Sequence, residues 1–539
     1  MNQRPARQLC STPAAIWLLL LLVLAVNFAI RWRLRDLPLE RDEGEYAYAG
    51  QLLLQGIPPY QLAWNMKFPG VYFAYAGLLA VFGESAAGIH CGLIFVTSLS
   101  TLLVFLIGRK LLNPLGGLMA AAFFTWLSAL PFAYGLAGHA THFVVLCVCL
   151  GMFGLLRKEK SQPLFWLGLA GVAFGLAILM KQHAVVFALA AAAWLGWQMF
   201  RNKIKSFLPG AVFLAGVAAP LLLTFALLAW AGVWERFNFW TMQYARQYVS
   251  IFPLAAAPTQ FVAGFGPVFN DGVWIWLLGS AGLGLLFTAY RPMVKVSAGW
   301  LFAGLVAACP GFYFRGHYFL MAMPALALLN AALLLALADW LEKFPQIRML
   351  KILPAVLFCL VTGDLLVRNA GIWFQLTPLE VSRRLYQFNP FPESPVIARY
   401  LAAHTQPDDT IAVLGSEPQL FFLAHRHSAS GYLYVYPLTE PQPLAPVMRA
   451  EFKQEIENAR PKYVVQVNAL ASWRTLILPG ETDQILADFD QWWTAYATNY
   501  QLVGQVDLAE DQPTAFYWDE QLSVRTNPLP ANLSIFRRK

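Results

Sequence analysis

The chain has 539 residues, of which 58% are hydrophobic and only 13% are charged, and its mean hydropathy is +0.51. A water-soluble globule of this length could not cover its surface with so few charged side chains, so the composition excludes an ordinary soluble protein. The net charge of +8 comes from short clusters of Lys and Arg between apolar runs, a pattern that fits anionic lipid headgroups. Membrane lipids are therefore the expected surroundings, and nucleic acid is excluded as a partner.

Eleven apolar segments are long enough, or nearly long enough, to cross a bilayer, which takes about 20 residues. They cover residues 14–30, 89–107, 116–133, 139–156, 164–180, 184–200, 208–231, 272–290, 296–310, 318–338 and 351–367. The first segment ends in Arg31-Trp32-Arg33 without a small-residue cleavage site, so we expect an uncleaved span rather than a signal peptide.

A further apolar run, over residues 71–82, decides the topology because each added crossing inverts every later loop. If this run does not cross, the loops rich in Lys and Arg lie on the same side as Arg4 and Arg7, as the positive-inside rule requires. We therefore predict a helix lying on or dipping into the outer membrane face, within one long extracytoplasmic loop over residues 31–88. The expected protein is a multi-pass protein of the cytoplasmic (inner) membrane with a cytoplasmic N-terminus.

A change of composition near Pro378 marks a second domain, because mixed polar and charged residues with frequent Pro follow it. We predict a transmembrane domain over residues 1–377 and an extracytoplasmic domain over residues 378–539. Residues 410–414 and 463–467 read as strands, and residues 396–404, 451–459 and 482–496 as amphipathic helices. The predicted fold class is a polytopic α-helical membrane protein of about eleven spans, with juxtamembrane helices in the first outer loop and a C-terminal soluble α/β domain.

The densest cluster of ionisable residues is Arg41-Asp42-Glu43-Gly44-Glu45-Tyr46, just beyond the first span. Asp42 with Glu45 three residues later fits a capping box for a helix over residues 47–54. This structural interpretation leaves Glu43 unexplained, and carboxylates at a membrane interface can be partly desolvated and act as an acid or a base. Spacing alone supports the structural and the catalytic interpretations equally.

Cations follow in the predicted outer loops. Lys67, in Met66-Lys67-Phe68-Pro69-Gly70, either snorkels to lipid phosphate or neutralises a phosphate leaving group. Arg315 is better suited to hold a phosphate bidentately at the outer end of a span. Snorkelling is an adequate account of Lys181, at the outer end of the fifth span.

Two His residues, His139 and His142, lie three positions apart before the fourth predicted span. They could ligate a metal from one helical face, but the nearby sequence offers no carboxylate, so a polar contact within the helical bundle is favoured. The topology places these residues on the same side of the membrane as Asp42, Lys67, Arg315 and His317.

At these residues the chain resembles the GT-C superfamily of membrane glycosyltransferases, in particular the group of the protein O-mannosyltransferases and the bacterial aminoarabinose-to-lipid A transferases. Asp42-Glu43-Gly44-Glu45-Tyr46 matches the family's Asp-Glu pair at the start of a juxtamembrane helix, and Lys67-Phe68-Pro69-Gly70 loosely matches its Lys-Pro-Pro element. Arg315-Gly316-His317-Tyr318-Phe319 also resembles a family feature. The resemblance covers nearly all of residues 1–370, although Thr141 and His142 lie where the family has an acidic residue.

The resemblance implies a hexosyl- or pentosyltransferase that moves a sugar from a polyprenyl-phosphate carrier to an extracytoplasmic protein, lipid or glycan acceptor, with inversion. By the same resemblance, Asp42 with Glu43 would be catalytic, and Lys67 and Arg315 would bind the carrier phosphate. The remaining predicted substrate-binding residues are Glu45, Tyr46, His139, His142, Lys181, His317 and Tyr318.

Some lipid A transferases of this family bind a metal through a Glu before the Lys and a His in a later outer loop. This sequence has Met66 at the first position and no His near Tyr244, so we predict no metal site of that kind and no cofactor, and leave a divalent metal elsewhere open. Two other functions stay open: a lipid or glycan transporter or flippase, and a ligase using a lipid-linked oligosaccharide. Sparse ionisable residues in the spans disfavour the transporter.

Overall fold

The computed structural model describes residues 13–157, 163–203, 206–473, 481–508 and 513–539. Arg4 and Arg7, which contribute to the predicted orientation, lie outside these residues. The chain divides into two compact units that interleave along the sequence. The first unit is formed by Met1–Arg35, His90–Leu223 and Leu254–Gln375, and the second by Asp36–Ile89, Thr224–Pro253 and Leu376–Lys539.

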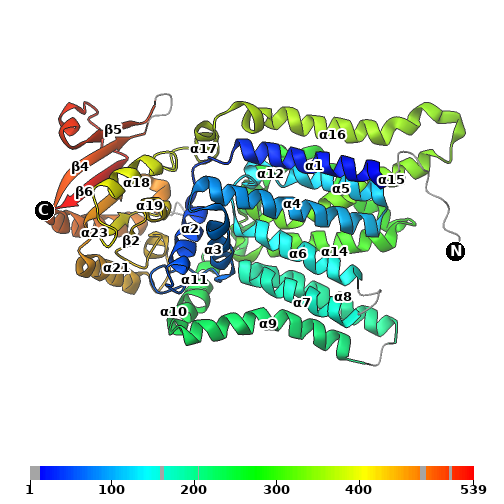
Figure 1. Ribbon diagram of the computed structural model, residues 1–539, viewed down its shortest axis with the longest axis horizontal. Helices are drawn as coiled ribbons and strands as arrows, with labels where there is room; N and C mark the ends of the chain where they lie inside the picture. Colours follow the sequence, from blue (N-terminus) through cyan, green and yellow to red (C-terminus); the bar gives the residue numbers. More distant parts are fainter. Residues whose placement is uncertain (1–12, 158–162, 204–205, 474–480, 509–512) are drawn as a thin grey trace. The chain divides into compact units, whose positions relative to one another are not determined.

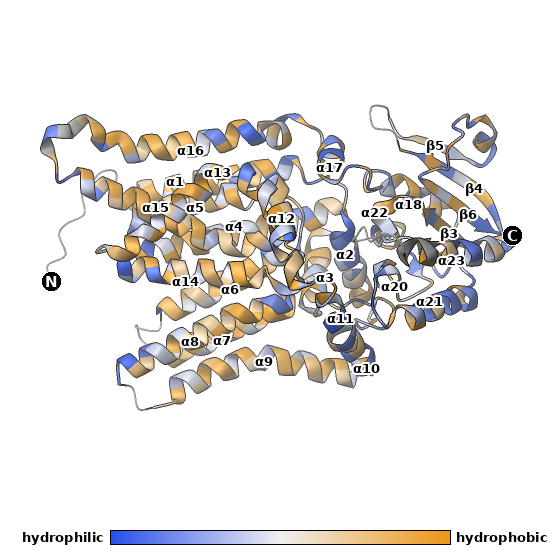
Figure 2. Ribbon diagram, turned by 180° about the vertical axis from the view of Figure 1, so that it is seen from behind, coloured by the Kyte–Doolittle hydropathy of each residue, from blue (hydrophilic) through white to orange (hydrophobic). Residues whose placement is uncertain are grey.

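The first unit is a bundle of apolar helices (Figure 1), and Figure 2 shows hydrophobic residues along most of their length. Each of the eleven predicted spans coincides with a helix, so the chain is a multi-pass membrane protein of the predicted fold class. These helices are α1 (Pro13–Arg33), α4 (Ala86–Leu111), α5 (Pro114–Leu127), α6 (Ala140–Arg157), α7 (Pro163–Met180), α8 (Val185–Arg201), α9 (Leu208–Trp230), α13 (Val273–Gly282), α14 (Arg291–Ala307), α15 (Met323–Leu341) and α16 (Leu353–Ala370), with α12 (Ala257–Asp271) beside them.

Helix length alone does not give eleven crossings. Among the described residues, eight helices are long and apolar enough to cross a membrane, or nine if the helices over residues 234–249 and 254–271 form one broken span. Three predicted spans are shorter helices, since α5 has 14 residues, α13 has 10 and α14 has 17. The count of eleven is therefore not confirmed by length.

A buried polar connection joins α1 to the turn that follows α5. Arg31, near the end of α1, donates hydrogen bonds to the carbonyl oxygens of Ser128 at 2.7 Å and Gly135 at 2.6 Å. Carbonyls left without a helical partner need such donors in an apolar interior. The bonds from Arg31 therefore stabilise the turn over residues 128–139 that separates α5 from α6. One turn earlier on α1, Asn27 donates to Thr97 and Ser98 at 3.1 and 3.0 Å, which joins α1 to α4.

The apolar helix α3 (Gly70–Phe82) belongs to this second unit and has 13 residues. At 1.5 Å per residue it is about 20 Å long, which is shorter than the roughly 30 Å hydrocarbon core. Its length therefore agrees with a helix that does not cross. Before it, α2 (Arg41–Leu54) begins six residues earlier than the expected residue 47.

The rest of the second unit is an α/β structure with a six-stranded mixed sheet in the order β2-β1-β3-β6-β4-β5. The strands are β1 (Thr410–Leu414), β2 (His427–Ser428), β3 (Tyr463–Val467), β4 (Tyr500–Asp507), β5 (Ala515–Trp518) and β6 (Leu533–Arg538). The first three run parallel, and β6, β4 and β5 extend the sheet antiparallel. The α/β prediction is confirmed, and β1 and β3 match the predicted strands residue for residue.

Helices surround this sheet and connect its strands (Figure 1). They are α17 (Pro378–Tyr386), α18 (Ser394–Ala403), α19 (Gln419–Ala424), α20 (Tyr436–Thr439), α21 (Ala445–Ala459), α22 (Leu470–Trp473) and α23 (Glu481–Tyr496). The intervening segment Thr224–Pro253 adds α10 (Trp234–Asn238), the π-helix Phe239–Tyr244 and α11 (Ala245–Val249). Helices α21 and α23 cover two of the predicted amphipathic ranges, and α18 covers the third except for its last residue, His404. Strands β4, β5 and β6 are half-buried and were not predicted from hydropathy.

The loop that follows the first predicted span packs as part of the C-terminal domain. The amide of Trp64 donates to the carbonyl oxygen of Gly431 at 2.8 Å, and Trp64 forms a parallel bridge with Tyr432. A Cβ atom on Gly44 would lie 2.5 Å from the backbone nitrogen of Gln419, so α2 contacts α19 almost backbone to backbone. Residues 36–89, which we grouped with the membrane domain, therefore fold with residues 376–539.

The topology can be tested with single cysteines at two exposed positions. Ser85→Cys should react with a membrane-impermeant maleimide in whole cells, and Lys110→Cys should react only after the cells are opened. Mass spectrometry of the labelled peptides separates these thiols from the six native cysteines. The reverse pattern would contradict the predicted orientation of the loop over residues 31–88.

Candidate functional site

The start of α2 sets the geometry of the acidic cluster. Glu40 is the N-cap: its carboxylate accepts a hydrogen bond from the Glu43 amide at 2.8 Å, and the Glu43 carboxylate accepts one from the Glu40 amide at 3.4 Å. The predicted capping box of Asp42 and Glu45 is therefore wrong, because the box lies two residues earlier. Glu43 is fully buried in this structural role. Asp42 and Glu45, three apart on one helical face, bind other partners.

Both of these carboxylates bind Lys67. The Lys67 Nζ lies 2.8 Å from Asp42 Oδ1 and 2.6 Å from Glu45 Oε2. Tyr72, on α3, donates its hydroxyl to Glu45 Oε1 at 2.6 Å, and Tyr60 donates to the Lys67 carbonyl oxygen at 2.6 Å. The Glu45 side chain is 1% exposed and the Asp42 side chain is 24% exposed. Glu45 therefore holds Lys67 from the buried side, and Asp42 is the carboxylate that a reactant can approach.

Two aromatic rings lie beside the same ammonium group. Lys67 Nζ is 4.6 Å from the ring centroid of Tyr46 and 5.5 Å from that of Tyr434. Burial by itself would lower the pKa of Lys67, but the adjacent Asp42 and Glu45 outweigh burial and raise it above its ordinary value. Lys67 therefore remains charged, and the favourable ring contacts add to its charge pairing.

A second ion pair fixes the helix start to the C-terminal sheet. Arg41 Nη2 lies 2.5 Å from Glu417 Oε1 and 2.8 Å from Asn389 Oδ1, and its Nε donates to the Ser416 carbonyl oxygen at 2.5 Å. Glu417 is fully buried at the carboxyl end of β1. Burial lowers the pKa of Arg41, but Glu417 outweighs burial and raises it. Ser416 and Glu417 were not among the predicted site residues, although they directly follow the predicted strand and Gly415.

A second group of predicted residues belongs to the first unit. The rings of His139 and His317 stack with centroids 4.0 Å apart and planes 9° apart, and Tyr134 contacts both rings edge-on. Tyr318 packs against His317 at 4.8 Å, and Lys181 Nζ lies 4.4 Å from the Tyr318 ring centroid. Thus His139, Lys181, His317 and Tyr318, which are far apart in the sequence, form one aromatic and cationic cluster.

Two other predicted residues lie near this cluster in sequence but differ in exposure. His142 is buried in the first turn of α6. Arg315 is exposed immediately before the 3-10 helix Gly316–Ala322, and its guanidinium carbon lies 5.6 Å from the Tyr313 ring centroid. An exposed guanidinium can receive a phosphate, whereas His142 contributes to packing. The predicted site residues thus form an acidic group in the second unit and a cationic, aromatic group in the first.

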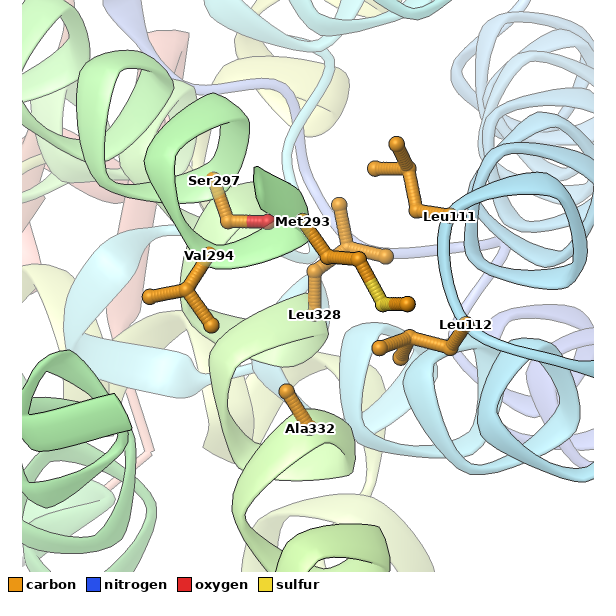
Figure 3. A pocket seen from close by; sticks show the side chains of 7 residues that line it. All are labelled: Leu111, Leu112, Met293, Val294, Ser297, Leu328 and Ala332. Atoms are coloured by element: carbon orange, nitrogen blue, oxygen red, sulfur yellow. The ribbon is translucent and has the colours of Figure 1, made fainter. Parts of the chain in front are cut away.

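A pocket in the first unit does not belong to either group. It leaves no room for a water molecule and is lined by Leu111, Leu112, Met293, Val294, Ser297, Leu328 and Ala332 (Figure 3). The Ser297 hydroxyl is the polar group of an otherwise apolar lining. We assign this pocket to packing between α4, α14 and α15.

The pairing of Lys67 predicts a clear effect on stability. Lys67→Met should lower the free energy of unfolding by about 3 kcal/mol, because it leaves two partly buried carboxylates without a counter-charge. Thermal unfolding in detergent micelles measures this effect. The difference in unfolding free energy between the wild type and Lys67→Met should shrink as the pH falls and the two carboxylates become protonated, because protonation removes the unpaired negative charge.

Lys462→Met is the matched control, because Lys462 is exposed on the same unit. It should leave the unfolding midpoint unchanged. Equal midpoints for the Lys67 variant and this control would show that the pairing does not stabilise the unit.

The comparison with protein families gives one match. Residues 66–230 match the family of dolichyl-phosphate-mannose-protein mannosyltransferases. No curated protein sequence matches the chain significantly.

Several solved structures share the fold. The structure of ArnT from Cupriavidus metallidurans bound to undecaprenyl phosphate has a TM-score of 0.57 and 16% identity, over 94% of this chain and 98% of that chain. The archaeal oligosaccharyltransferase AglB from Archaeoglobus fulgidus, in complex with an inhibitory peptide and a dolichol-phosphate, has a TM-score of 0.54 and 12% identity, over 96% and 75%. The arabinofuranosyltransferase AftD from Mycobacteria has a TM-score of 0.52 and 12% identity, over 98% and 40%.

An A. fulgidus oligosaccharyltransferase structure in complex with Zn and sulfate matches with a TM-score of 0.52 and 14% identity, over 94% of this chain and 74% of that chain. Together with the family match, these structures confirm the predicted resemblance to the GT-C glycosyltransferases. At these identities the structures establish the shared fold.

Proposed function

We propose that this chain, which has the fold of the GT-C membrane glycosyltransferases, transfers a hexosyl or pentosyl group from a polyprenyl-phosphate carrier to an acceptor outside the cytoplasmic membrane. The observation that carries the proposal is the partly exposed Asp42 carboxylate held beside the charged Lys67. Two relatives support the donor class, because ArnT was solved with undecaprenyl phosphate and AglB with a dolichol-phosphate. The acceptor is a protein, a lipid or a glycan.

Asp42 acts as the general base in this proposal. The acceptor hydroxyl oxygen attacks the anomeric carbon while its proton moves to Asp42. The bond between that carbon and the phosphate oxygen breaks, and the polyprenyl phosphate leaves with the bonding electrons. Attack opposite to the leaving group inverts the anomeric centre. Asp42 then returns its proton to water.

Cations stabilise the departing phosphate. Lys67 remains charged and contacts Asp42 from one side, so it is the cation nearest to the proposed base. Glu45 holds Lys67 from the buried side, which limits how far the ammonium moves towards a phosphate. Exposed Arg315 is the second phosphate ligand, since a guanidinium can bind two phosphate oxygens together.

The remaining predicted residues have supporting roles. We assign His139, Lys181, His317 and Tyr318 to substrate binding because they form one cluster of rings and charge. His142 supports that cluster from the buried first turn of α6. The Tyr46 ring contacts Lys67. The Glu43 carboxylate caps α2, so we assign the role of general base to Asp42.

The role of Asp42 has a direct test. Asp42→Asn should reduce sugar transfer about 10³-fold, because the amide cannot accept the proton. Removal of a general base typically lowers the rate 10²- to 10⁴-fold. Stability should change little, because the amide oxygen still accepts hydrogen bonds and the helix cap is made by Glu40 and Glu43. Transfer to a membrane acceptor from radiolabelled polyprenyl-phosphate sugar measures the effect.

The exposed Asp408 in the same unit provides the control variant, Asp408→Asn, which should transfer normally. Full activity of Asp42→Asn would exclude the general-base role.

The donor class can be tested without knowing the acceptor. Mass spectrometry of lipid that co-purifies with the protein should detect a polyprenyl phosphate or its sugar conjugate. Arg315→Gln should reduce that lipid several-fold because it removes a bidentate phosphate ligand, and the exposed-residue control Arg399→Gln should not. Absence of any polyprenyl phosphate from the wild-type protein would instead favour the transporter.

A ligase for a lipid-linked oligosaccharide is the second candidate. The structural similarity to the oligosaccharyltransferase AglB favours it. The mass of the co-purified conjugate separates these two functions, because a single sugar indicates the glycosyltransferase and a longer glycan indicates the ligase.

A further inference from the structure

The C-terminal domain places one side chain against the proposed base. Tyr434 lies between β2 and α20 and is buried, with only 8% of the residue exposed. Its hydroxyl lies 3.3 Å from Asp42 Oδ1 and 3.1 Å from the Arg41 carbonyl oxygen. One phenol proton is thus shared between the catalytic carboxylate and the first turn of α2. The two residues are 392 positions apart in the sequence, and both belong to the second unit.

The phenol ring is held on its other side. The rings of Tyr434 and Tyr436 stack with centroids 5.7 Å apart and planes 9° apart. The Tyr436 hydroxyl donates to the Ala471 carbonyl oxygen at 2.8 Å, and the Val435 amide donates to Ser416 Oγ at 3.0 Å. Ser416 also accepts a hydrogen bond from Arg41 through its carbonyl oxygen. The backbone and the ring of Tyr434 are therefore fixed relative to α2.

The surroundings of Tyr434 keep its hydroxyl a donor. Burial raises its pKa well above the ordinary value, and the charges of Glu45 and Asp42 raise it further. The phenol therefore remains protonated throughout the pH range in which the enzyme can work. Toward a carboxylate, it can act only as a hydrogen-bond donor.

We propose that Tyr434 is a positioning residue of the transfer site, donating a hydrogen bond that orients the Asp42 carboxylate beside Lys67 and favours its ionised form. This inference rests on the proposed function, because it assigns Tyr434 to the general base of that reaction. The C-terminal domain then completes the site rather than only covering it. A hydrogen bond to the charged form of an acid lowers the pKa of that acid.

Asp42 has several charged and titratable neighbours within the second unit. Those around Asp42 and its ion-pair partner Lys67 are Glu40, Arg41, Glu43, Glu45 and Tyr46 on or beside α2, Tyr75 on α3, and Tyr434 from the C-terminal domain, with Tyr72 on α3 bonded to Glu45. Tyr434→Phe removes the hydroxyl that bonds Asp42 and the neutral carbonyl of Arg41, and it leaves all of these charges in place. A shift in the Asp42 titration therefore reports on that bond.

The experiment compares the wild type with Tyr434→Phe and Tyr436→Phe in the transfer assay between pH 4.5 and 8.5. Without the Tyr434 hydroxyl, Asp42 should protonate at higher pH, so the acid limb of kcat should move up by about one pH unit. KM for the donor should change less than twofold, and kcat at high pH should fall less than about tenfold. Tyr436→Phe, which loses a bond to a backbone carbonyl, should leave the acid limb in place.

The outcomes separate this inference from the proposed function. A wild-type protein that transfers no sugar at any pH overturns the function and the inference with it. A wild type that transfers sugar, with an unmoved acid limb in Tyr434→Phe, overturns only the inference. Equal shifts in both variants would also overturn it, because they would show a general effect of loosening this stack. Thermal unfolding of each variant establishes that the proteins compared are folded.

Discussion

The ammonium of Lys67 between the carboxylates of Asp42 and Glu45 is the interaction on which the proposed site depends. Placing three charges where solvent is scarce is unfavourable unless each finds a partner, and each contact here is 2.8 Å or shorter. The two acids are not equivalent, because Glu45 is enclosed by Tyr72 and Asp42 is not. The asymmetry gives one carboxylate a structural role and leaves the other accessible for chemistry.

The arrangement of the chain explains how this ion cluster is held. The loop after the first predicted span carries Asp42, Glu45 and Lys67, but its two helices are too short to bury these side chains without support. The C-terminal domain supplies that support through Glu417, which binds Arg41, and through the close contact of α19 with Gly44. The proposed catalytic loop and the soluble domain are consequently one folding unit, and loss of either should disrupt the other.

The apolar helices of the first unit are held together by buried hydrogen bonds to the turns between them. Their interior is apolar, so the turns between them must find hydrogen-bond donors within the bundle. Arg31 does this for the turn between α5 and α6, and that turn ends at His139. The stacked pair of His139 and His317 therefore depends on a buried Arg in the first span. The low sequence identity to ArnT, AglB and AftD shows that different sequences can form this architecture. The architecture requires mainly apolar helices and turns whose backbone polar groups are hydrogen-bonded.

Local composition and periodicity were sufficient to predict several features of this chain. Each apolar segment predicted from hydropathy coincides with a helix, short apolar runs predicted β1 and β3, and the acidic cluster with Lys67 marked the loop after the first span as a candidate site. The tertiary structure was needed to show which carboxylate caps α2, which one binds Lys67 from the buried side, and that Tyr434 reaches Asp42. These contacts join residues 25 and 392 positions apart. Side-chain pairing over such separations depends on tertiary packing, which local sequence patterns do not predict.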